Sequence, residues 1–165
     1  MSILVAYFSR SGNTKKVAES IFGALPGEKS LSPIEKIGDL KDFRIIFIGF
    51  PVHSHTVPFP VEEFLKKIPR GTKIALFSTH GSFTGSRLSR EAIEYAATTV
   101  SQAELLGSFS CRGEVSDQAI ELLSRSSEHK GWAEMSTSAR SHPDEHDLKE
   151  AQDFAKWILT LAAQR

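Results

Sequence analysis

The run from Ser9 to Thr14 carries side chains suited to binding a phosphate group. Its letters are Ser9-Arg10-Ser11-Gly12-Asn13-Thr14, with three hydroxyl groups and one glycine. Hydroxyl groups donate hydrogen bonds to phosphate oxygens, and glycine lets the backbone approach a ligand closely. If a helix begins at the end of this run, its unpaired N–H groups and its dipole attract the same anion. The chemistry indicated is the binding of one terminal phosphate.

The segments on either side of this loop predict a strand before it and a helix after it. Residues 3–8 are almost wholly apolar and too few for a helix, which is typical of a strand buried on both faces. After the loop, apolar residues recur at helical spacing, with charged residues on the opposite face. The apolar positions are Val17, Ala18, Ile21, Phe22 and Leu25. The sequence therefore predicts a helix that begins near Thr14.

The loop departs from other phosphate-binding motifs in ways that narrow its chemistry. It has neither the Gly-x-x-x-x-Gly-Lys-Ser/Thr pattern of nucleotide triphosphatases nor the Gly-x-Gly-x-x-Gly pattern of dinucleotide folds. It also contains no cysteine that could act as a phosphatase nucleophile. Phosphate binding is therefore favoured over phosphoryl transfer, and the alternative is a serine-rich turn that only caps a helix.

The run Ile3-Leu4-Val5-Ala6-Tyr7-Phe8-Ser9-Arg10-Ser11-Gly12-Asn13-Thr14 resembles the opening of the flavodoxin family, which binds FMN. The resemblance implies that the loop holds the FMN phosphate, and that loops after the third and fourth strands hold the flavin ring. These loops lack the tryptophan and tyrosine that often stack on the ring in the family, and no glycine lies between Phe50 and Pro60. The FMN-binding residues that the resemblance implies are Ser9, Arg10, Ser11, Gly12, Asn13, Thr14, Pro51, Val52, His53, Ser54, His55, Thr79, His80, Gly81, Ser82 and Phe83.

The rest of the chain alternates between apolar runs and amphipathic segments. Strands are predicted at 28–31, 44–51, 73–78 and 104–111, with helices from 59 or 60 to 68 and from 86 or 87 to 101. Such alternation predicts an α/β fold with a parallel sheet, and ligands bind such sheets outside the carboxyl ends of the strands. The resemblance implies a flavodoxin-like three-layer sandwich with five strands in the order 2-1-3-4-5 and helices on both faces.

The tail breaks this alternation. Ser116 and Asp117 can cap a short helix that ends at Leu123, and a final helix starts near Pro143. Between them, residues 124–141 show no sustained periodicity and are expected to be irregular, as a functional cover or as a mobile surface loop. Trp132 in this segment either covers the ligand or packs within its own segment. We expect a single domain spanning 1–165, because 165 residues with 40% hydrophobic content fill one core.

Composition excludes several classes of protein. Twenty basic and 20 acidic side chains give zero formal charge, so nothing steers the chain toward nucleic acid or an anionic membrane. Flavodoxins that act as soluble electron carriers are typically strongly acidic, and this chain departs from that pattern. One cysteine and no long apolar stretch predict a cytoplasmic protein without a membrane span. No metal site is predicted, because His53 and His55 have no neighbouring ligands to complete a shell.

The resemblance implies an FMN-binding redox protein that transfers electrons to a partner redox protein. Two alternatives stay open at this point. One is an NAD(P)H-dependent FMN oxidoreductase of the quinone reductase type, and the other is a flavin-free binding module on the same fold. The sequence leaves the oligomeric state open.

Overall fold

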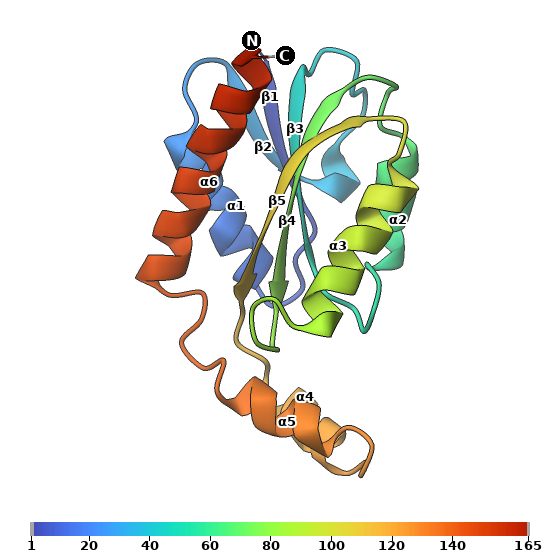
Figure 1. The fold of residues 1–165 in the computed structure, drawn as a ribbon, viewed down its shortest axis with the longest axis vertical. Helices are drawn as coiled ribbons and strands as arrows, with labels where there is room; N and C mark the ends of the chain where they lie inside the picture. The colour runs from blue at the N-terminus through green and yellow to red at the C-terminus, as the bar shows by residue number, and fades with distance from the viewer. Residues whose placement is uncertain (1, 165) are drawn as a thin grey trace.

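Five parallel strands form one sheet in the computed structural model, which describes residues 2–164 (Figure 1). The strand order is β2-β1-β3-β4-β5, and every neighbouring pair is parallel. This order confirms the predicted fold class. The strands are β1 (Ile3–Tyr7), β2 (Lys29–Pro33), β3 (Ile45–Pro51), β4 (Lys73–His80) and β5 (Glu104–Arg112).

Helices cover both faces of the sheet and make three layers (Figure 1). One face packs against α1 (Asn13–Ala24) and α6 (Glu145–Gln164), and the other against the 3₁₀ turn η1 (Ile34–Lys36), α2 (Phe59–Lys66) and α3 (Arg87–Thr99). Alternate residues of the central strands enter the two apolar cores, which is the period of a strand buried on both sides. Within residues 2–164, no helix combines the length and the apolarity that a membrane crossing requires.

Two short helices lie beyond the carboxyl ends of β4 and β5, apart from the three layers (Figure 1). They are α4 (Asp117–Ser124) and α5 (Lys130–Thr137), and together we call them the α4–α5 hairpin. Ser116 caps α4, as the sequence predicts. The expectation that residues 124–141 are irregular is wrong, because α5 lies within them. Only Ala133 and Ser136 of α5 are buried, so contacts with the rest of the fold stabilise this helix more than its own pattern does.

Strand β4 also extends two residues further than predicted. Thr79 pairs with Pro51 of β3 and with Cys111 of β5, and His80 pairs with Arg112. Both polar residues therefore belong to the strand rather than to the loop after it. Their backbone positions are fixed by the sheet, while Gly81 and the residues that follow form the loop.

Candidate cofactor-binding site

The loop between β1 and α1 presents free N–H groups at the start of the helix. Gly12, which precedes the helix, has φ +95°, in the left-handed region that glycine tolerates. The Ser9 Oγ atom accepts hydrogen bonds from the N–H groups of Gly12 (3.1 Å) and Lys15 (3.3 Å). The N–H groups of Asn13 and Thr14 find no acceptor within residues 2–164. The loop therefore offers two N–H donors at the positive end of a helix dipole.

Two hydroxyl groups of this loop lie in different surroundings. Thr14 is buried, and its Oγ1 lies 2.8 Å from Oγ1 of Thr79 at the end of β4. Ser11 is exposed, and its side chain forms no hydrogen bond within the described part of the chain. Thr14 therefore links α1 to β4, while the Ser11 hydroxyl is free to bind a ligand.

A cavity of about 400 Å³ opens at the carboxyl edge of the sheet, beside this loop. That volume falls within the roughly 300–1,000 Å³ typical of small-molecule sites. The structure brings together ten of the residues expected to bind the cofactor around this cavity. They are Arg10, Ser11, Asn13, Thr14, Pro51, Val52, His53, Thr79, His80 and Gly81. Ser9 and Gly12 shape the loop but do not line the cavity.

The segment after β5 forms a wall of the cavity that sequence reasoning missed. Gly113, Glu114, Val115 and Ser116 line it, together with Ala119 of α4. The Asn13 side-chain amide donates to the Glu114 carbonyl (2.8 Å), and a Cβ on Gly113 would lie 2.7 Å from that amide nitrogen. A signal was present, since this loop also follows a parallel strand and must open at the same edge.

The loop after β3 folds into a tight turn beside the cavity. His53 and Thr56 exchange two backbone hydrogen bonds of 3.0 Å, and Ser54 at the tip has φ +55°. His55 Nδ1 pairs with the Glu91 carboxylate of α3, which also accepts from Arg87 Nε. The hydrogen bonds with Arg87 and, to a smaller extent, with His55 lower the pKa of Glu91. The two histidines therefore have different surroundings: His53 lines the cavity of about 400 Å³, and His55 does not.

The loop after β4 contributes to a second, smaller cavity of about 200 Å³. Ser54 and Ser82 line this smaller cavity, whereas Phe83 lines neither. The Phe83 ring is 57% exposed, with the Arg112 guanidinium 4.9 Å from its centroid. Its N–H group contacts Met135 Sδ at 3.4 Å. Phe83 therefore lies against the α4–α5 hairpin and not in the expected position beside the ligand cavity.

His80 is the most perturbed histidine of the site. Its side chain is only 5% exposed, and burial lowers its pKa to about 4, so the imidazole is neutral at neutral pH. Nδ1 lies 3.0 Å from the Ser82 carbonyl oxygen, which assigns the proton to Nδ1 as the donor. Nε2 is then an acceptor, and it has no hydrogen-bond partner within residues 2–164. A buried acceptor without a partner at a cavity wall is suited to a ligand N–H or O–H group.

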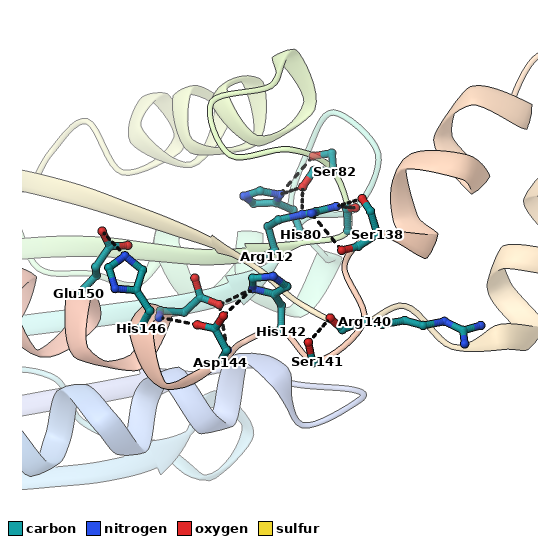
Figure 2. A network of polar contacts seen from close by, with 12 residues as sticks. His80, Ser82, Arg112, Ser138, Arg140, Ser141, His142, Asp144, His146 and Glu150 are labelled. Atoms are coloured by element: carbon teal, nitrogen blue, oxygen red, sulfur yellow. Dashed lines mark hydrogen bonds and ion pairs between the residues drawn. The ribbon is translucent and has the colours of Figure 1, made fainter.

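Arg112, the last residue of β5, fastens the hairpin to the loop after β4 (Figure 2). Its guanidinium donates to the carbonyl oxygens of Ser82 (3.0 Å), Met135 (2.9 Å) and Ser138 (3.1 Å), and to Ser138 Oγ (2.7 Å). The carbonyls of Met135 and Ser138 lie at the end of α5, where a cation is favoured by the helix dipole. One side chain thus holds two walls of the smaller cavity together.

A polar cluster lies at the start of α6, where two of its side chains cap the helix (Figure 2). The Asp144 and Asp147 side chains each accept from the other residue's N–H group at 2.9 Å, and His142 Nδ1 lies 2.6 Å from Asp147 Oδ2. This is a reciprocal capping arrangement. The interpretation of this stretch as a helix start accounts for all three side chains.

A parallel sheet of order 2-1-3-4-5, with a loop after its first strand that leads directly into a helix, defines a flavodoxin-type α/β protein. The model of the Flavodoxin domain family matches residues 4–156, and the chain belongs to this family. It is 30% identical to a flavodoxin-like domain-containing protein, BilS, of Clostridioides difficile (strain CD3), over 99% of each chain.

Solved structures share the fold at lower identity. An oxidised flavodoxin 2 from Bacillus cereus has a TM-score of 0.64 at 22% identity, covering 97% of this chain and 99% of that one. A flavoprotein from Lactobacillus acidophilus NCFM in complex with FMN has a TM-score of 0.55 at 19% identity, covering 66% of this chain and 92% of that one. These likenesses establish the fold.

Proposed function

We propose that this chain binds FMN and transfers electrons to a partner redox protein. The observation that carries the proposal is the cavity at the carboxyl edge, where the N–H groups of Asn13 and Thr14 and the Ser11 hydroxyl meet the ends of β3 and β4. FMN combines one terminal phosphate with a polar chain and a planar ring, and the site has a matching donor cluster beside apolar walls. The flavoprotein from L. acidophilus was solved with FMN, and its likeness supports the same ligand here.

Each part of the site has a distinct role in this proposal. The N–H groups at the start of α1 and the Ser11 hydroxyl hold the phosphate. Arg10 lines the same cavity, and its guanidinium, 5.6 Å from the Phe8 ring centroid, adds a cation at the rim. Bound FMN would supply the redox chemistry, while the protein orients it and excludes water.

Replacing Ser11 with alanine should weaken FMN binding about tenfold or more, because a hydrogen bond to a charged group contributes about 1.5–3 kcal/mol. Riboflavin lacks the phosphate, so its affinity should be nearly unchanged. Ser11 is the sharper position for this test than Thr14, whose hydroxyl also contacts Thr79. Isothermal titration calorimetry of the wild-type protein and of Ser11→Ala with both ligands measures the change in each affinity. Equal losses for FMN and riboflavin would place the phosphate elsewhere.

The purified, FMN-loaded protein should oxidise neither NADH nor NADPH at a sustained rate, because a carrier exchanges electrons only with its partner. The assay follows absorbance of the nicotinamide with and without a quinone acceptor, under air and under nitrogen. Free FMN at the same concentration is the control. Sustained oxidation that saturates with nicotinamide would instead support the oxidoreductase alternative.

A further inference from the structure

The smaller cavity lies where the α4–α5 hairpin meets the ends of β3 and β4. Val52, His80, Gly81 and Val115 line both this cavity and the larger one, so the two cavities adjoin. Most of the walls of the smaller cavity are apolar. The apolar side chains are Val52, Leu88, Val115, Leu123, Trp132 and Met135. A ligand with a polar phosphate end and a planar apolar end fits across both cavities.

The hairpin and the segment that leads into it pack directly on the backbone of the loop after β4. A Cβ on Gly81 would lie 2.3 Å from Cγ2 of Val115, in the segment before α4, and 3.1 Å from Oγ of Ser136, in α5, so this close approach requires glycine. Arg112 fixes the same contact from the side through the carbonyls of Ser82 and Met135. The hairpin wall of the cavity is therefore built into the fold.

Trp132 lines the smaller cavity, and neighbouring rings contact its indole. Its ring stacks on His129, with centroids 4.8 Å apart and planes at 21°, and it meets His55 edge-on at 6.2 Å. His55 is itself held by Glu91 of α3. An indole constrained on two sides at a cavity wall is already oriented to stack on a planar ligand.

His80 requires that a ligand bound beside it carry a hydrogen-bond donor. Its Nε2 atom is a buried acceptor that no group of residues 2–164 bonds, and the residue lines both cavities. A planar ligand that satisfies this atom must carry an N–H or O–H group. The isoalloxazine ring of FMN is planar, with an apolar dimethylbenzene end and a polar pyrimidine end that carries a ring N–H group.

We propose that the α4–α5 hairpin is part of the cofactor site, with Trp132 stacking on the flavin ring and His80 Nε2 accepting from a ring N–H group. This inference rests on the proposed function, which concerns the phosphate end of the same ligand. It assigns ring binding to a segment after β5, in addition to the loops after β3 and β4. The ring and the phosphate then have separate, independently testable subsites.

The test compares FMN with lumiflavin, which has the ring but neither the ribityl chain nor the phosphate. Trp132→Leu should weaken binding of both ligands about tenfold, and Trp132→Phe should retain most of the affinity. Wild type should quench the fluorescence of bound FMN strongly, and Trp132→Leu should restore it. Trp157→Leu, at the other tryptophan of the chain and half-exposed on α6, is the matched control and should change neither readout. Circular dichroism of each variant verifies folding.

The possible outcomes separate this inference from the proposed function. If wild type and Trp132→Leu bind FMN with equal affinity and equal fluorescence, the hairpin subsite is overturned while FMN binding stands. If Ser11→Ala weakens FMN but not lumiflavin, and Trp132→Leu weakens both, the two subsites are supported together. If wild type binds no flavin, both proposals fail.

Discussion

Replacing Arg112 with methionine should lower the free energy of unfolding by about 3 kcal/mol and loosen the α4–α5 hairpin. The guanidinium donates to four carbonyl oxygens, the fourth being that of Gly81, and to one hydroxyl. Hydrogen bonds to charged groups contribute about 1.5–3 kcal/mol each. The full sum is not expected, because part of this cluster is exposed and water can replace some contacts. Urea unfolding gives the stability change, and hydrogen exchange shows whether the amides of 117–137 lose protection before the sheet does.

Arg125→Met is the matched control for this prediction. Arg125 directly follows α4. Among the described residues its side chain pairs with Glu121 alone, and both side chains are about two-thirds exposed. Such surface pairs contribute about 0.3–0.5 kcal/mol. If Arg112→Met destabilises the protein no more than Arg125→Met, Arg112 does not fasten the hairpin to the sheet.

Stability should fall by about 2 kcal/mol between pH 7 and pH 5 because of His80. Burial lowers the pKa of this histidine to about 4 in the folded protein, against an ordinary value of 6.5. The unfolded chain therefore binds a proton at His80 below about pH 6.5, whereas the folded protein does not until about pH 4. The contribution of His80 to the free energy of unfolding is greatest above pH 6.5 and declines as the pH falls through this window. The complete loss, reached below about pH 4, is about 3 kcal/mol.

Urea titrations at half-unit steps from pH 5 to pH 7 measure this slope in wild type and in His80→Gln. The glutamine variant should lose most of the slope, whatever its absolute stability. The carboxyl groups with lowered pKa, such as Glu91 and Asp153, have ordinary values of 4.5 and 3.8 and titrate below this range. His146→Gln, at an exposed position on α6, should keep the slope. An unchanged slope in His80→Gln would show that His80 is not the titrating group.

Much of the fold could be predicted because its signals are local. The run at 3–8 is almost wholly apolar, and Val17, Ala18 and Ile21 repeat at helical spacing. Residues close together in the sequence are therefore enough to predict the strand, the loop and the helix. The loop proposed to hold a phosphate lies between these two elements, and the resemblance to flavodoxins rests on the same residues. The sheet order came from that resemblance, and the structure confirms it.

The hairpin could not be predicted because its contacts are remote in sequence. The Arg112 guanidinium donates hydrogen bonds to backbone carbonyl oxygens 23 and 26 positions further along the chain. No sequence pattern around those two residues indicates that their carbonyl oxygens accept these bonds. His55 was expected beside the flavin, yet a carboxylate 36 positions away holds it. The sequence predicts that the fourth strand ends at residue 78, because the stretch from 79 to 86 is rich in residues that permit unusual backbone angles. The pairing of Thr79 and His80 with the end of β5 makes them strand residues.

A parallel titration of the wild-type protein with FMN and with riboflavin, followed by flavin fluorescence, tests whether the protein binds FMN through its phosphate. The two ligands differ only in the phosphate that the loop at 9–14 is proposed to hold. Because several hydrogen bonds to a charged group are involved, FMN should bind about 100-fold tighter or more. Equal affinities for the two ligands would show that the protein does not hold the FMN phosphate, and no binding of either would contradict FMN binding itself.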